Sequence, residues 1–81
     1  MESQLLHYFG NTVRRLRTER GFSQESFADA CGLHRTYISD IELGKRNVSL
    51  ENIERVSNAL EISISQLFEE VEREYVGVWR I

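Results

Sequence analysis

Apolar side chains recur at helical spacing along nearly the whole chain, and this periodicity constrains the fold more than any other feature. From Leu5 to Arg20 they lie three or four residues apart, as on one face of an amphipathic helix. Proline, which interrupts helices, is absent from all 81 residues. Four further segments show the same period, near residues 23–30, 34–43, 49–60 and 63–76. The pattern predicts an all-α fold of five helices in a single domain, residues 1–81.

Serine residues mark the expected N-termini of three of these helices. Ser23 and Ser49 are suited to cap the second and fourth helices, because a serine side chain accepts a hydrogen bond from a free backbone amide. Ser63 opens a capping box for the fifth helix. The fourth helix is expected to turn Leu50 and Ile53 inward, together with the apolar residues that follow at helical spacing.

Two glycines leave the helical pattern open to more than one interpretation. Gly10 falls inside the first segment and predicts either a close contact with another helix or a later helix start. Gly77 is expected to end the fifth helix and release a short apolar extension, residues 77–81. This extension is expected to fold back on its own domain or on a second copy of the chain, and the alternative is contact with a different polypeptide.

The second and third predicted helices are short and are joined by a tight turn at Gly32. The third helix carries Ile38 and Ile41 on one face and polar side chains on the other. Two such helices with a glycine turn form a helix-turn-helix motif, here residues 24–43. Because the major groove of B-DNA admits one α-helix, the polar face of the third helix is expected to meet base edges.

The chemistry of the polar face suits base recognition. Arg35 fits the edge of a guanine, and Thr36 can contact a thymine methyl or a base acceptor. Asp40 can accept from the amino group of cytosine, although it would repel a nearby phosphate. Tyr37 either contacts the DNA backbone or packs within the protein.

Charge is distributed unevenly along the chain, whose formal net charge is −3. Residues 1–48 hold seven basic and six acidic side chains, whereas residues 49–81 hold three basic and seven acidic ones. Gln24 opens the second predicted helix, and Lys45 and Arg46 follow the third; all three are expected to contact phosphates. The alternative is that the two loop cations serve solubility only.

Enzymatic and metal-binding functions find no support in the sequence. It contains no nucleophile motif, no glycine-rich phosphate loop and no metal-spaced histidine or cysteine cluster, so we expect neither catalysis nor a cofactor. Cys31 is the single cysteine and is expected to be a small core residue in a reducing, cytoplasmic and bacterial setting. The chain shows no export signal and no run of apolar residues long enough to span a membrane.

Residues 21–28 (GFSQESFA), 33–42 (LHRTYISDIE) and 44–46 (GKR) closely resemble the Cro/CI-type helix-turn-helix family, also called XRE. The resemblance covers residues 13–68 and implies a five-helix, lambda-repressor-like DNA-binding domain with a short C-terminal extension. It implies base contacts from Arg35, Thr36, Ser39 and Asp40, and backbone contacts from Gln24, Tyr37, Lys45, Arg46 and Asn47. It also implies a structural ion pair between Arg17 and Glu42.

Within this family, the string His-Arg-Thr-Tyr-Ile-Ser, the loop Arg-Asn-Val-Ser and the chain length look like the controller proteins of restriction-modification systems. That resemblance implies a homodimer that binds a pseudo-palindromic operator in double-stranded DNA and regulates its own operon. It further implies activation, with RNA polymerase as a potential partner, followed by repression. Phage repressors and antitoxins share the motif and remain alternatives.

The fifth helix carries more apolar side chains than one small domain is expected to bury. A second copy of the chain would cover them, and would place two recognition helices about 34 Å apart, one turn of B-DNA. The expected dimer interface consists of Ile64, Leu67, Phe68, Val71 and Tyr75.

Overall fold

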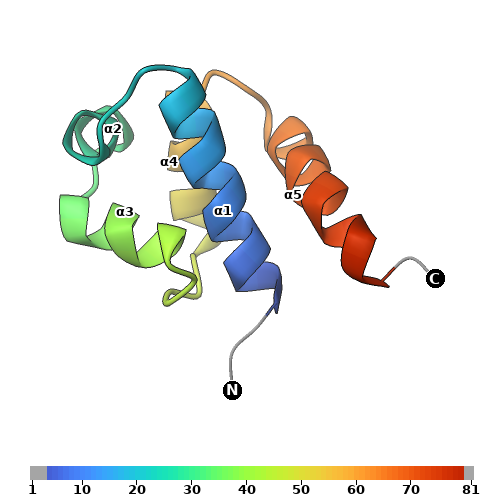
Figure 1. Cartoon of the computed structure of the whole chain (residues 1–81). Coiled ribbons are helices and arrows are strands. Elements are labelled where there is room, and N and C mark those ends of the chain that lie inside the picture. The colour runs from blue at the N-terminus through green and yellow to red at the C-terminus, as the bar shows by residue number, and fades with distance from the viewer. Residues whose placement is uncertain (1–3, 80–81) are drawn as a thin grey trace.

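Five helices make up the described part of the computed structural model, which comprises the backbone of residues 4–79 and the side chains of residues 4–74. No strand occurs in residues 4–79, so the structure confirms the predicted all-α, five-helix fold. Helix α1 crosses the middle of the domain, with α2 and α3 to one side and α5 to the other (Figure 1). The helices are α1 (Gln4–Glu19), α2 (Gln24–Cys31), α3 (Arg35–Glu42), α4 (Leu50–Ala59) and α5 (Ile64–Trp79).

The predicted serine caps are present at three helix N-termini. The Ser23 hydroxyl accepts from the amide of Ser26 at 3.0 Å, and the Ser49 hydroxyl accepts from the amide of Asn52 at 3.2 Å. The reciprocal bonds of the Ser63 capping box, to the amide and side chain of the residue three positions later, are also formed. These local bonds explain why α2, α4 and α5 begin where they do.

The C-terminal end of α5 differs from the sequence prediction. Gly77 does not release an extension at that point, because the helical backbone continues through it to Trp79. A glycine inside a helix costs only about 1 kcal/mol relative to alanine. This cost is too small for one glycine to end the helix. The expected contacts of the 77–81 side chains lie outside the described residues.

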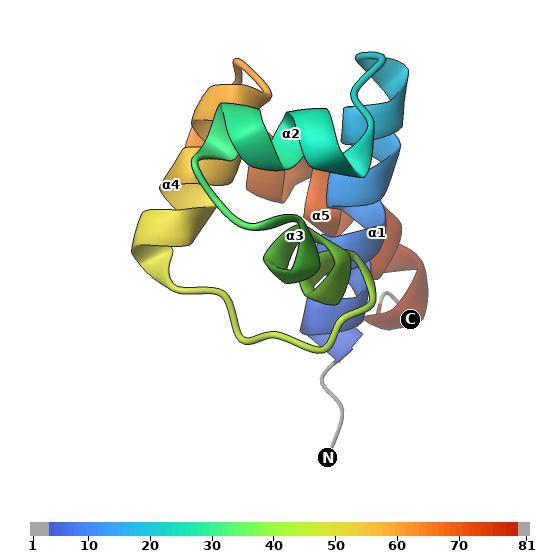
Figure 2. The ribbon, with the colours of Figure 1, turned by 90° about the vertical axis from the view of Figure 1, so that its left-hand side faces the viewer.

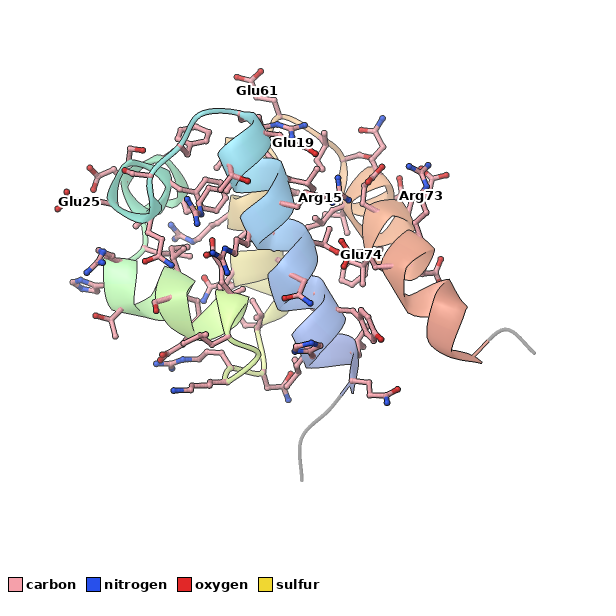
Figure 3. All side chains as sticks on the ribbon, in the orientation of Figure 1. Arg15, Glu19, Glu25, Glu61, Arg73 and Glu74 are labelled. Atoms are coloured by element: carbon pink, nitrogen blue, oxygen red, sulfur yellow. The ribbon has the colours of Figure 1, made fainter. Side chains whose placement is uncertain are left out.

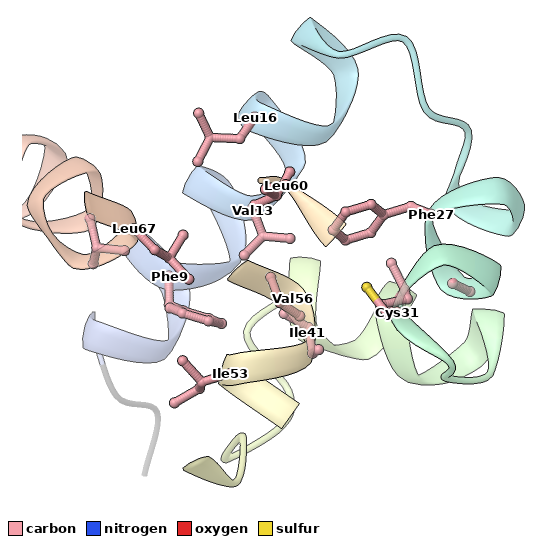
Figure 4. Packing of buried hydrophobic residues seen from close by; sticks show 13 residues of the cluster. Phe9, Val13, Leu16, Phe27, Cys31, Ile41, Ile53, Val56, Leu60 and Leu67 are labelled. Carbon is pink, nitrogen blue, oxygen red and sulfur yellow. The ribbon is translucent and has the colours of Figure 1, made fainter. Parts of the chain in front are cut away.

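All five helices contribute to one hydrophobic core (Figure 4). Val13 of α1, Phe27 of α2, Ile38 of α3 and Val56 of α4 are all fully buried. The inward orientation predicted for Leu50 is wrong, because this first residue of α4 is 83% exposed. The core also contains Phe9, Leu16, Ala28, Cys31, Ile41, Ile53, Leu60, Leu67 and Val71.

Gly10 lies where α1 packs closely against the C-terminal end of α3. A Cβ atom at this position would lie 2.8 Å from the carbonyl oxygen of Glu42 and still closer to that of Ile41. Since α1 already begins at Gln4, the structure selects the close helix contact over the later helix start. The glycine thus lets the C-terminal end of α3 rest directly on α1.

Helix α5 is joined to α1 by charged side chains at the edge of the core. Arg15 donates to Glu70 at 2.7 Å and to Glu74 at 3.3 Å, and Figure 3 shows Arg15 and Glu74 facing each other between the two helices. Both bonds raise the pKa of Arg15, with the bond to Glu70 as the main cause, and the bond from Arg15 lowers the pKa of Glu70. Among residues 4–79, no helix has the length and apolar content needed to cross a membrane.

Candidate nucleic-acid interface

Helix α3 lies on the surface of the domain with one face turned to solvent. In Figure 2 it is seen in front of α1 and α5, between α2 and the loop that leads to α4. Ile38 and Ile41 are buried beneath it, whereas Arg35 and Thr36 in its first turn are exposed. Ser39 and Asp40 are half-buried. Burial of the apolar face therefore leaves the predicted base-reading face available to a ligand.

The turn before α3 fixes its angle to α2. Gly32 has a φ of +71°, in the left-handed region where glycine carries no steric penalty. Its amide bonds back to Asp29, and the amide of Leu33 bonds to the carbonyl of Ala28 at 2.9 Å. Such bonds satisfy the free carbonyl groups at the end of α2 and start the chain into α3.

A buried ion pair holds the other end of α3 against α1. Arg17 donates through Nε to Glu42 Oε2 at 2.6 Å and through a terminal nitrogen to Oε1 at 3.1 Å. A further bond from Arg17 reaches the carbonyl of Phe22 at 2.8 Å, at the entry to α2. The side-chain Nε2 of Gln24 donates to Glu42 Oε1 at 3.1 Å. Gln24 therefore bridges α2 and α3 through this pair, and its expected phosphate contact stays a prediction.

A second charged cluster lies on the outer side of α3. Arg46 donates to the Asp40 carboxylate at 3.2 Å, and its guanidinium carbon lies 4.6 Å from the centroid of the Tyr37 ring. The Tyr37 hydroxyl in turn accepts a hydrogen bond from the side chain of Asn52 at 2.9 Å. The structure thus brings together one residue expected to read bases, two expected to contact the backbone and one from α4.

Asn52 was not singled out from the sequence. It is separated from Tyr37 by fifteen positions and belongs to another helix, so no local spacing relates the two. Its position in the first turn of α4, after the Ser49 cap, is the only sequence signal that places it at a helix end. Lys45 is exposed in the loop, and Asn47 lines a shallow apolar hollow beside Leu5.

Cys31, the single cysteine of the sequence, is buried in the core. Burial raises the pKa of the Cys31 thiol to about 11, so this thiol is uncharged at neutral pH. No cluster of three or more histidine, cysteine or acidic side chains suited to a metal ion occurs in the part of the chain that the structure describes.

The expected dimer interface requires a correction. Leu67 and Val71 are fully buried within the monomer and have no surface left for a second copy. Ile64 is 44% exposed, and Phe68 is half-buried one turn later on the same face of α5. Phe68 and Leu5 also line the apolar hollow, whose volume is about 90 Å³. The side chain of Tyr75 lies outside the described residues.

Comparison with known proteins supports this reading of the motif. A family model described as helix-turn-helix matches residues 13–67. The control protein C.MunI from a Mycoplasma species is 54% identical over 67 residues, which make up 82% of this chain and 90% of that protein. The crystal structure of the restriction-modification controller protein C.AhdI from Aeromonas hydrophila matches with a TM-score of 0.76 and 48% identity, over 78% of this chain and 96% of that one.

A further match is the restriction-modification controller protein C.Esp1396I, solved as a tetramer in complex with its natural 35 base-pair operator. Its TM-score is 0.86 at 36% identity, over 93% of this chain and 99% of that one. The chain therefore belongs to the helix-turn-helix family and, within it, to the control proteins of restriction-modification systems.

Proposed function

We propose that this chain is a sequence-specific DNA-binding regulator that controls transcription of a restriction-modification operon, including its own gene. The observation that carries the proposal is the exposed polar face of α3 above fully buried Ile38 and Ile41, in a chain similar to a controller bound to its operator. A short helix held rigidly by its apolar side and offered to solvent by its polar side suits the major groove.

The roles within the interface follow from exposure and chemistry. Arg35 and Thr36 project from the first turn of α3 and are proposed to read base edges, with Ser39 one turn later. Lys45 and Arg46 are proposed to hold phosphates, because both are exposed cations at the end of the recognition helix. The backbone amides at the N-terminus of α2 add a further site for a phosphate.

We propose that the chain acts as a homodimer. The supporting surface is the apolar patch of Leu5, Ile64 and Phe68, where a second copy would remove these side chains from water. Leu5 and Phe68 line one hollow, and Ile64 lies one turn before Phe68 on α5. A twofold axis at this patch would present two copies of α3 to a pseudo-palindromic operator. If the dimer activates transcription, a contact with RNA polymerase would belong to the acidic surface of α5.

The DNA-binding proposal is tested with the purified protein and the DNA directly upstream of its gene. We expect tight, saturable binding with a protected repeat, measured by titration and footprinting at several salt concentrations, against a shuffled sequence as control. Equal affinity for both DNAs, lost at modest salt, would reduce the interaction to sequence-independent phosphate contact and contradict the proposal.

The dimer is tested by the substitution Ile64→Glu, which places a charge in the apolar patch. We expect a monomer in sedimentation equilibrium with unchanged helical content, because an acidic residue in the first turn of α5 suits the helix dipole. Ser65→Glu adds the same charge one position along, at an exposed polar site, and should leave the dimer intact. Dimers of equal strength in both variants would place the interface elsewhere.

A further inference from the structure

We propose that Asp40 is a positioning residue for Arg46 and does not read a base. The inference rests on the proposed DNA binding and assigns to one acidic side chain a task different from the one its sequence position suggests. It is carried by the cluster of Asp40, Arg46, Tyr37 and Asn52 on the outer side of α3.

The carboxylate of Asp40 is engaged by its own protein. Its Oδ2 accepts from Arg46 at 3.2 Å, and its side chain is only 29% exposed, in contrast to the exposed Arg35 and Thr36 one turn earlier. A free carboxylate at a DNA surface would meet phosphate repulsion. A carboxylate paired with a guanidinium is neutralised locally, which explains how an acid is tolerated on this face.

The guanidinium of Arg46 is held from two directions. Asp40 fixes one edge, and the face of Tyr37 lies beneath the guanidinium carbon at 4.6 Å. Tyr37 is itself held through its hydroxyl by Asn52 at 2.9 Å. Arg46 belongs to a loop, but the Tyr37 ring on which it rests is held in place by α4.

This arrangement leaves most of the hydrogen-bonding capacity of Arg46 unused. A guanidinium has five N–H donors, and in the described structure a single bond, to Asp40, is made. The side chain is 47% exposed, so the remaining donors are available to a phosphate without release of the carboxylate. Because binding then orders fewer rotatable bonds, the contact loses less conformational entropy than a free arginine would.

Two effects of Asp40 on DNA binding consequently oppose each other. Positioning of Arg46 favours the complex, and repulsion between the carboxylate and the DNA disfavours it. The first effect requires Arg46, whereas the second does not. Removal of the carboxylate charge should therefore weaken DNA binding when Arg46 is present and strengthen it when Arg46 is absent. Neither base reading nor charge repulsion alone would produce this reversal.

The test is a double-mutant cycle on the upstream DNA with wild type, Asp40→Asn, Arg46→Ala and the double variant. In the presence of Arg46 we expect Asp40→Asn to weaken binding about threefold, on the scale of an exposed ion pair and cation–π contact. In the Arg46→Ala background we expect the same change to tighten binding about twofold, because only repulsion is removed. Equal fold-changes in both backgrounds would overturn the proposal.

Three controls separate positioning from other roles. Asp40→Glu keeps the charge and should recover most of the wild-type affinity. Asp29→Asn makes the same chemical change on exposed α2, where the side chain has no partner among the described residues, and should show no coupling to Arg46. A loss of discrimination at one base pair in Asp40→Asn, independent of Arg46, would restore the base-reading role and overturn the proposal.

The mobility of the Arg46 side chain can be measured in the free protein, so this test does not depend on the operator. In the free protein, ¹⁵N relaxation of the Arg46 Nε–H should show restricted motion in wild type and greater motion in both Asp40→Asn and Tyr37→Leu. Unchanged motion in these variants would contradict the proposal even where DNA binding is normal. Absence of sequence preference in wild type, combined with restricted Arg46 motion, would instead refute the proposed function alone.

Discussion

Helix α3 carries two acidic residues that pair with arginines in opposite surroundings. Glu42 meets Arg17 at 2.6 Å, with only 3% and 9% of the two side chains exposed. Asp40 meets Arg46 at 3.2 Å, with 29% and 47% exposed. The inner pair ties α1, α2 and α3 together, whereas the outer pair keeps a cation available at the surface. The same chemistry thus serves the scaffold on one side of the helix and the proposed binding surface on the other.

Helix geometry explains why residues so close in sequence serve different sides. Two positions along an α-helix correspond to a rotation of about 200°, which turns the second side chain to the opposite face. Glu42 therefore points with Ile38 and Ile41 toward α1, and Asp40 points away from them. The contrast predicts that changes at the inner pair alter stability and that changes at the outer pair alter binding.

The largest effect is expected when the inner pair is broken. Arg17→Met leaves the Glu42 carboxylate buried without its cation, which should lower the free energy of unfolding by about 3–5 kcal/mol. The measurement is urea denaturation followed by circular dichroism. Arg17→Met combined with Glu42→Met removes both charges and should regain much of the loss, because no buried charge is then left unpaired. Equal destabilisation by the single and double variants would show that the pair itself is unimportant.

A smaller effect is expected at the contact on which the inner pair depends. Gly10→Ala places a methyl group against the carbonyl oxygens of Ile41 and Glu42, which are backbone atoms and cannot rotate away. We expect destabilisation of about 1–3 kcal/mol by the same denaturation assay, in the range of overpacked cores. Asn11→Ala, at the exposed neighbouring position, should change stability by less than about 0.5 kcal/mol. A Gly10→Ala variant as stable as wild type would contradict the close approach of α1 and α3.

The smallest effect is expected at Arg15. Its side chain is 39% exposed, between the 9% of Arg17 in the inner pair and the 47% of Arg46 in the outer pair. Its hydrogen bond lowers the pKa of Glu70 below the ordinary value of 4.5. A carboxylate whose pKa is lower in the folded state stabilises the fold above its unfolded pKa and loses this contribution as pH falls through the folded pKa. Wild type should therefore exceed Arg15→Gln in unfolding free energy at neutral pH, and the difference should shrink on acidification below pH 4.5. If the difference in unfolding free energy between wild type and Arg15→Gln stayed constant on acidification, the stabilising role of the bond between Arg15 and Glu70 would be contradicted.

Local signals in the sequence were sufficient for most of the fold. Apolar spacing placed all five helices, and side chains within three residues of each cap explain the starts at Ser23, Ser49 and Ser63. The errors arise where tertiary packing decides. Leu50 has the correct period but begins α4 beyond the reach of the core, and Leu67 contacts the other helices of its own monomer. Nothing in residue spacing distinguishes such a core position from a dimer contact.

The candidate interface was predicted in part. The exposed face of α3 followed from the positions of Ile38 and Ile41, and the pair of Arg17 and Glu42 was implied by the family resemblance. The engagement of Asp40 by Arg46 was not predicted, because the loop that returns the arginine to α3 is set by the turn at Gly44, with a φ of +73°. Residue spacing assigns a side chain to one face of a helix. It does not reveal which other side chain of the protein is already bonded to it.

The most direct test of sequence reading by α3 compares Arg35→Ala with wild type for the ratio of affinities toward upstream and shuffled DNA, at one fixed salt concentration. Because Arg35 is exposed on the outer face of α3 and its side chain forms no hydrogen bond or ion pair with the described residues, we expect unchanged thermal stability. The ratio of affinities should fall by about five- to 150-fold, the equivalent of about 1–3 kcal/mol for one base contact. A ratio equal to that of wild type would show that α3 does not read the DNA sequence.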